Sequence, residues 1–306
     1  MKNVYLYLAA LALIASAGLG AYSENFGSGD NQFTLSFVDI SANPGVTSST
    51  NTNGDTVETF TNGVVGDYTD PGYNYRMGTY EITNDQFSKF KAEYGTVTGD
   101  PSSAYDESPS YTGSSVPTNN VSWYEAAQFV NYLNTSKGHQ AAYKFTGTQG
   151  ESSYALSTWS EAEAAGGTNL YRHKDAQFFL PTEDEWVKAA YWNGSSIQTY
   201  ATTDGSTPQD GVDSNYDDAT QPWDVGSGTE ELNGTFDMMG NVSEWMESPW
   251  NDVNYDADIF RGLRGGECNF NVSPLASSER FYYNPKAEDN LVGFRVASVP
   301  EPATMA

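Results

Sequence analysis

Three short helices, each marked at its start by the same four-residue pattern, most limit what this chain can fold into. The pattern is Ser or Thr followed three residues later by Glu or Gln, and it begins at Thr83, Ser122 and Thr182. In such a capping box the hydroxyl and the acid or amide bind the free N–H groups of a helix start. Apolar residues follow at helical spacing, so we expect them in the core rather than in a ligand platform. They are Phe87, Phe90 and Tyr94; Trp123, Ala127, Val130 and Leu133; and Trp186, Ala189 and Ala190.

Long segments rich in glycine, serine and tyrosine separate these helices, such as residues 100–115 and 146–168. Loops of this length are unusual in a compact domain. Residues 33–40 alternate apolar and polar side chains, which predicts a half-buried strand. Residues 43–70 are rich in Asn, Thr, Gly and Ser, a composition that predicts either an ordered, irregular loop or a mobile linker. The sequence contains no internal repeat.

The charge balance is strongly acidic. The 306 residues include 40 acidic and 14 basic ones, with a formal net charge of −26. A field of this sign repels phosphate backbones and anionic lipid, so we expect no nucleic-acid partner. It also attracts divalent cations, although adaptation to a saline setting explains the same composition.

The two ends resemble sorting signals. Lys2, an apolar run over residues 6–17 and small residues before position 22 predict a signal peptide over residues 1–21. We therefore expect an exported bacterial protein, secreted or on the cell surface, with one domain over residues 25–298. Residues 299–302 resemble the start of a PEP-CTERM sorting tail, in which a hydrophobic helix and a basic end normally follow. We interpret 299–306 as a truncated tail, so a membrane contact is expected only through its missing part.

An oxygen-rich turn, FDMMGNVSEW over residues 236–245, places Asp237 and Glu244 on either side of Gly240 and Asn241. Carboxylate and main-chain oxygens that converge at a glycine turn suit calcium, which takes six to eight oxygen ligands. The same residues are also typical of a surface turn that leads into a short helix.

Five ordered blocks of the sequence resemble one known family. They are RMGTYEITNDQF (76–87), PTNNVSWYEAAQFVNYL (117–133), FFLPTEDEWVKAAYW (178–192), GNVSEW (240–245) with RGLRGG (261–266), and VGFRVAS (292–298). Together they are similar to the sulfatase-modifying-factor family, whose model is the formylglycine-generating enzyme. The resemblance implies a single domain of the mixed α/β (α+β) class with a C-type-lectin-like core. It also implies little regular secondary structure and long loops that are ordered by packing and by bound calcium.

The resemblance also implies positions for calcium ligands. The side chains of Asp237 and Glu244 and the main-chain oxygens of Gly240 and Val242 match one site. A second site falls around Asn215 and Tyr216, with Asp217 or Asp218 as its acid. The spacing around these acids approaches an EF-hand loop, but Asp218 replaces the required glycine.

Copper is not expected. Enzymes of this family hold copper(I) with two cysteines after the RGG block, and the matching positions here are Phe270 and Leu275. Cys268, the only cysteine, is at most a weak catalytic candidate, because one thiolate cannot replace two. A buried, unreactive role is commoner for a free cysteine.

Other chemistry finds little support in the sequence. His139 and His173 lack a metal-ligand spacing. Arg264 and Arg295 resemble the family's structural arginines, which pair with buried acids, although a ligand role is an alternative.

We predict an exported, monomeric, calcium-stabilised domain that keeps the scaffold without the oxidase chemistry and binds a glycan or peptide at a surface or in a matrix. One alternative is an oxygen-dependent formylglycine-generating oxidase or a related oxidoreductase. Another is a structural matrix protein without a specific ligand. Fold alone does not decide among them.

Overall fold

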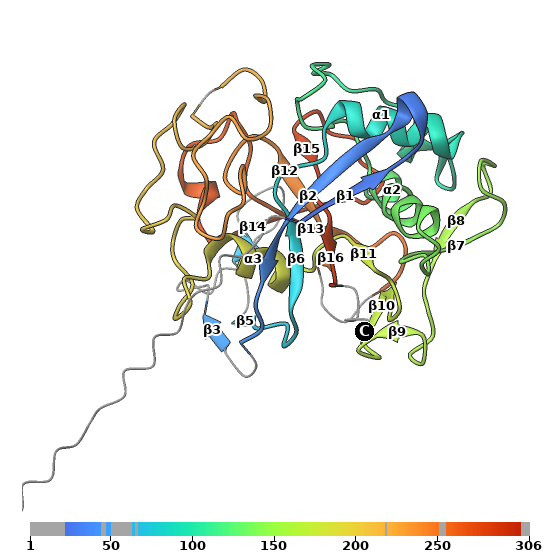
Figure 1. Ribbon diagram of the computed structural model, residues 1–306, viewed down its shortest axis with the longest axis horizontal. Helices are drawn as coiled ribbons and strands as arrows, with labels where there is room; N and C mark the ends of the chain where they lie inside the picture. Colours follow the sequence, from blue (N-terminus) through green and yellow to red (C-terminus); the bar gives the residue numbers. More distant parts are fainter. Residues whose placement is uncertain are drawn as a thin grey trace, which may run out of the picture.

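The structure is a computed structural model that describes residues 22–43, 47–49, 63–64, 67–217, 219–250 and 255–300 (Figure 1). The predicted signal peptide, most of residues 43–70, Asp218 and the end of the predicted tail lie outside the described residues. Within them, no helix is long and apolar enough to cross a membrane.

All three predicted helices are present, and each begins at its predicted cap. Helix α1 spans Asn84–Tyr94, α2 spans Trp123–Ser136 and α3 spans Glu183–Tyr191. Thr83, Ser122 and Thr182 each accept a hydrogen bond from the third helical N–H, and the acid or amide at that position accepts one from the cap N–H. Both halves of the capping box are therefore formed in every helix.

Two five-stranded sheets form the centre of the molecule (Figure 1). The first has the order β1-β2-β6-β16-β11 and the second β15-β12-β13-β14-β4. The first consists of β1 Tyr22–Phe26, β2 Phe33–Ile40, β6 Tyr75–Gly78, β16 Ala297–Ser298 and β11 Phe178–Phe179. The second consists of β15 Val292–Gly293, β12 Ser243–Pro249, β13 Arg261–Arg264, β14 Glu279–Tyr283 and β4 Gly63–Val64.

Strand β2 occupies the predicted residues 33–40, and its alternate side chains Phe33, Leu35 and Phe37 are buried. Three two-stranded ladders lie outside the large sheets. They pair β3 Thr47–Ser49 with β5 Asp67–Thr69, β7 Lys144–Thr146 with β8 Ala155–Ser157, and β9 Ala164–Ala165 with β10 Asn169–His173. The segment 146–168 is thus partly regular. Single 3-10 turns span Gly29–Asn31, Ser102–Ala104 and Ser273–Leu275.

The helices pack their predicted faces into two apolar clusters. In the first, Phe87 and Phe90 of α1 meet Phe129 of α2 at ring-centroid distances of 5.9 and 5.1 Å. In the second, Trp186 of α3 packs with Met238, Met246 and Leu275. The aromatic residues of all three helical stripes are therefore core residues, as predicted, except for Tyr94, which is half-buried.

Buried ion pairs connect the second sheet to α3 and to neighbouring segments. Arg264 of β13 binds Glu183 of α3 at 2.7 Å, and Arg295 binds Glu244 of β12, with all four residues buried. The expected pairing of both arginines with buried acids is confirmed. Arg172 of β10 bridges Glu185 and Glu247 at 2.8 and 2.6 Å, a network that no residue spacing predicted.

Candidate functional site

The structure brings the two predicted calcium-binding stretches together. Asn215 and Gly240 form a parallel β-bridge, and the N–H of Asn241 donates to the main-chain oxygen of Asn215 at 2.9 Å. Gly240 has a φ of 76°, and a Cβ at this position would collide with the Asn215 carbonyl. Glycine is required here because only its bare α-carbon allows this approach.

Glu244 does not have the surroundings of a calcium ligand. It is fully buried, and Arg295 Nε donates to its two carboxylate oxygens at 2.9 and 2.7 Å. Trp186 Nε1 donates to the same carboxylate at 2.8 Å. The positive charge that calcium would supply at Glu244 is already supplied by a guanidinium.

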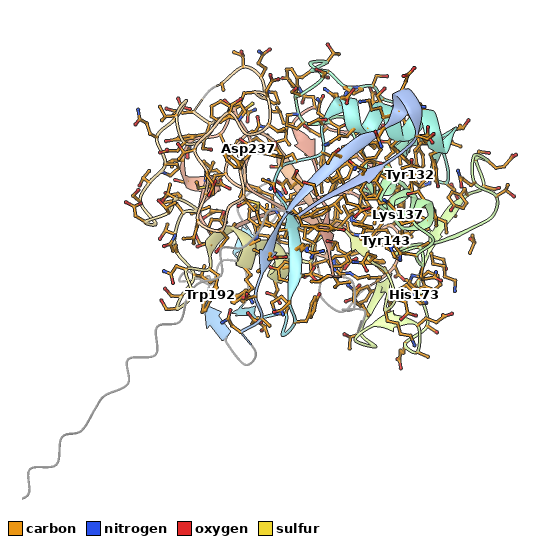
Figure 2. The ribbon with its side chains drawn as sticks, in the orientation of Figure 1. Tyr132, Lys137, Tyr143, His173, Trp192 and Asp237 are labelled. Atoms are coloured by element: carbon orange, nitrogen blue, oxygen red, sulfur yellow. The ribbon has the colours of Figure 1, made fainter. Side chains whose placement is uncertain are left out.

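Asp237 is likewise engaged by N–H donors. Its carboxylate accepts from Trp223 Nε1 at 2.8 Å and from the N–H of Gly226 at 2.6 Å. Figure 2 shows Asp237 on the loop-rich side of the molecule, away from His173 of β10. Across the described residues, no group of three or more His, Cys, Asp and Glu side chains could hold a metal ion. Calcium at this turn stays a prediction.

The residues of the second predicted calcium site point in different directions. Tyr216 is buried and its hydroxyl donates to the carbonyl of Pro208 at 2.7 Å. Asp217 is exposed, with a φ of 60°, and its N–H donates to the carbonyl of Phe270 at 2.6 Å. Asn215 donates through Nδ2 to the carbonyl of Gln221 at 3.1 Å. This site also stays a prediction.

The turn at 236–245 leads into strand β12 and not into a helix, and it is not on the surface. Residues 243–247 are buried, and Val242 donates its N–H to Glu81 at 3.3 Å. Period-two alternation is absent because this strand is covered on both faces. The alternative reading of a surface turn before a short helix was therefore wrong.

Four buried carboxyl groups interact electrostatically with the guanidinium of Arg295, and of these Glu244 is the one hydrogen-bonded to it; the sequence did not reveal this group. Besides Glu244 they are Glu81, Glu231 and Asp237. Burial raises the pKa of Glu231 to about 8 and that of Asp237 above its usual range. Burial, with repulsion from Asp237 and Glu244, raises the pKa of Glu81 well above its ordinary value. One guanidinium cannot neutralise four carboxylates, so protons are held in this cluster near neutral pH.

Of the two positions that match the family's copper ligands, Leu275 lies in the core and Phe270 is partly buried and packs against it. Leu275 is fully buried, and Tyr191 donates to its carbonyl at 2.9 Å. Phe270 packs against Phe281 with ring centroids 5.5 Å apart. Neither residue has a metal-binding atom in its side chain, so the residues present do not fit copper(I).

Cys268 is the nearest thiol to these positions. It is 0% exposed, and its Sγ lies 3.7 Å from the carbonyl of Ala219. Burial, helped by the negative charge of Glu267, raises the pKa of the thiol to about 12. The thiolate is the nucleophile and metal ligand, so burial disfavours the reactive form of this cysteine at neutral pH.

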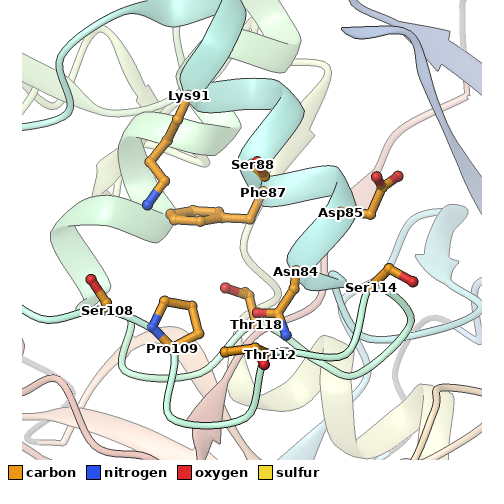
Figure 3. Close-up of a pocket in the computed structure, with 10 residues that line it drawn as sticks. All are labelled: Asn84, Asp85, Phe87, Ser88, Lys91, Ser108, Pro109, Thr112, Ser114 and Thr118. Carbon is orange, nitrogen blue, oxygen red and sulfur yellow. The ribbon is translucent and has the colours of Figure 1, made fainter. Parts of the chain in front are cut away.

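A cleft of about 420 Å³ lies between α1 and the loop that precedes α2 (Figure 3). Its walls carry short polar side chains from both elements, with the ring of Phe87 and the ammonium group of Lys91 at one end. The volume is within the range of roughly 300–1,000 Å³ typical of small-molecule pockets. No sequence motif marked this cleft, because its residues come from a helix face and an irregular loop.

Comparisons with known proteins agree with this architecture. Treponema denticola variable protein 1 superposes with a TM-score of 0.63 at 19% identity, over 91% of this chain and 99% of its own. CarF gives 0.60 at 20% identity over 87% and 99%, and PvdO from Pseudomonas aeruginosa gives 0.59 at 17% over 90% and 98%. At these identities the likeness concerns the fold alone. No curated protein matches the sequence significantly.

The family resemblance is confirmed by a match of residues 68–299 to the model of the sulfatase-modifying factor enzyme 1-like domain. This match covers well over half of the 306 residues. The mixed α/β, loop-rich fold agrees with it. The chain belongs to the FGE-sulfatase (sulfatase-modifying factor enzyme 1-like) domain family.

Proposed function

We propose that this chain is an exported binding protein that keeps the formylglycine-generating-enzyme scaffold without the oxidase chemistry. The proposal rests on one observation: the two positions that match the family's copper-binding cysteines are occupied by Phe270 and Leu275. Both pack against apolar neighbours in the described core. A soft metal such as copper(I) requires thiolate or thioether ligands, which these residues do not supply.

The oxidase alternative would have to use Cys268. Its burial and its raised pKa oppose thiolate formation, and a local rearrangement would have to open the contact of Cys268 with Ala219. A binding role makes no such demand, because it needs only a stable scaffold and a surface cavity.

Export is supported by the sequence pattern at the start of the chain. Strand β1 begins at Tyr22, so cleavage before this residue would leave all described elements intact. Mass spectrometry of the exported protein is expected to find an N-terminus between Gly18 and Tyr22. An intact Met1 on protein confined to the cytoplasm would contradict export.

Calcium stabilisation is proposed from the family resemblance alone, because the contacts of Glu244 do not fit an ion. Metal analysis of the purified mature protein tests calcium and copper together. After equilibration with both ions and removal of the excess, we expect no copper at stoichiometric level. One equivalent of copper that disappears in Cys268→Ser would contradict the proposed function, and absence of calcium would remove calcium from the proposal.

A further inference from the structure

The cleft between α1 and the loop over residues 105–118 has two buried polar atoms without partners. Among the described residues, neither Asn84 Oδ1 nor Thr118 Oγ1 has a hydrogen-bond partner, and both residues line the cleft. Thr118 is only 1% exposed. Buried polar groups are nearly always hydrogen-bonded, and leaving one unpaired is costly. The cleft therefore presents sites at which a ligand would gain hydrogen bonds.

The orientation of Asn84 fixes what kind of group it accepts. Its Nδ2 donates to the carbonyls of Tyr111 and Gly113 at 2.6 and 3.0 Å, which assigns the amide nitrogen to the loop. Oδ1 is left as a pure acceptor facing the cleft (Figure 3). A ligand must bring a donor such as a hydroxyl to this point, because a carboxylate or phosphate oxygen would be repelled.

The charges of the cleft exclude strongly charged ligands of either sign. Lys91 places its ammonium group 5.0 Å from the centre of the Phe87 ring, and it disfavours a cation. The formal charge of −26 on the whole chain disfavours a polyanion. Asp85, the carboxylate on the lining, is paired with Lys89 at 2.8 Å.

Within the described part of the chain, the Lys91 ammonium group contacts the Phe87 ring and forms no hydrogen bond or ion pair, so it can donate to a ligand. The nearby acid Glu125 interacts electrostatically with Lys91. Burial raises the pKa of Glu125 to about 8, so this acid is largely protonated at neutral pH and does not neutralise the Lys91 ammonium group. Ser108 and Thr112 lie across the cleft from α1 and add hydroxyl groups, while Pro109 adds an apolar surface (Figure 3). Hydroxyl donors and acceptors around a small apolar surface are complementary to a sugar ring.

We propose that this cleft binds a neutral sugar unit of a glycan, with ring hydroxyls satisfying Asn84 Oδ1 and Thr118 Oγ1 and accepting from Lys91. This inference rests on the proposed binding function and names its site and ligand class. A peptide is a less complementary occupant, because its hydrogen-bonding groups follow an extended backbone while the donors and acceptors here surround a compact space.

The test is calorimetric titration of the mature protein with defined probes. The probes are oligosaccharides of glucose, galactose, mannose and N-acetylglucosamine, an oligosaccharide of glucuronic acid, and a neutral Gly-Ser peptide. We expect at least one neutral saccharide to bind. Thr118→Val keeps the side-chain shape and removes a hydroxyl that has no partner in the described protein, so it should fold normally and bind about 10-fold more weakly.

Two further variants control the result. Thr148→Val removes a hydroxyl at an exposed turn and should leave the affinity unchanged. Lys91→Met keeps the side-chain stem beside Phe87 and should weaken a neutral ligand several-fold without abolishing its binding. Melting curves of each variant confirm that it is folded.

Three outcomes would overturn the inference. Saccharide binding that Thr118→Val does not affect would place the ligand elsewhere and leave the binding function standing. Tighter binding of the glucuronic acid probe or of the peptide would make the ligand class wrong. Failure of all neutral saccharides would reject the sugar site. Failure of the proposed function itself is recognised separately, by stoichiometric copper binding or by oxidase activity.

Discussion

At the scale of single residues, the buried charge of Arg295 is paired with Glu244, and Arg264 and Arg172 are paired with buried glutamates in the same way. Arg295 and Glu244 were identified from short blocks of resemblance, and the pairing expected for such arginines is present. Glu81 and Glu231, which also interact electrostatically with Arg295, were not identified, because an acid within a mixed stretch carries no mark of burial. Cys268 is buried, as is common for a free cysteine, but its neighbour Ala219 could not be inferred from spacing.

Glu244→Gln should destabilise the fold strongly. The substitution replaces the one carboxylate that is hydrogen-bonded to the fully buried Arg295 guanidinium by a neutral amide, and so breaks the direct ion pair. Breaking such a pair costs about 3–5 kcal/mol in free energy of unfolding. Urea unfolding followed by tryptophan fluorescence measures the change.

The matched control is Lys89→Gln, which breaks the more exposed pair with Asp85 on α1. Its loss should cost less than about 1 kcal/mol. Equal effects of the two substitutions would show that the Arg295–Glu244 pair does not stabilise the core as the structure indicates.

At the scale of elements, local signals predicted helices better than strands. The capping boxes at Thr83, Ser122 and Thr182 gave the helix starts because both partners lie within four residues of each other. Strand β2 was predicted because its buried side chains alternate with more exposed ones along much of its length, which produces a period of two in the sequence. Strand β12 was missed because both its faces are buried, and β11, β15 and β16 are too short to show a period. Their pairing depends on distant segments.

The cap of α2 makes stability depend on pH. Burial, together with repulsion from Glu288, raises the pKa of Glu125 to about 8, and burial raises that of Glu288 to about 7. The folded state therefore holds protons that the unfolded state releases at lower pH. Stability is greatest at and below the ordinary carboxyl pKa of about 4.5 for these groups and is lost as pH rises towards 8.

Glu125→Gln should reduce this pH dependence. Glutamine can still accept the hydrogen bond that Ser122 N–H donates at 3.0 Å, so the cap is kept and only the titration is removed. The free energy of unfolding, measured by urea titration from pH 5 to pH 8, should fall less steeply than in the unmodified protein. Glu161→Gln, at an exposed site, should leave the slope unchanged. An unchanged slope in Glu125→Gln would contradict the role of this pair.

At the scale of the whole molecule, the sequence blocks predicted the family and fold correctly, whereas the sites needed the three-dimensional arrangement. The match over residues 68–299 confirms the resemblance. Asn215 lies beside Gly240, a contact between two separately predicted sites that the sequence did not predict, and the ion-binding role of Glu244 depends on what else contacts it. The cleft beside α1 arises from a helix face and a loop joined only in space.

The central claim is that this scaffold has no formylglycine-generating activity, and oxidation of a peptide thiol tests it most directly. The purified mature protein is incubated with copper(I), oxygen and a sulfatase-type Cys-x-Pro-x-Arg peptide, and aldehyde is measured by mass spectrometry. We predict no aldehyde above the level of copper alone, because Phe270 and Leu275 supply no thiolate and Cys268 is buried with a raised pKa. Turnover that disappears in Cys268→Ala would contradict the account and establish an enzyme.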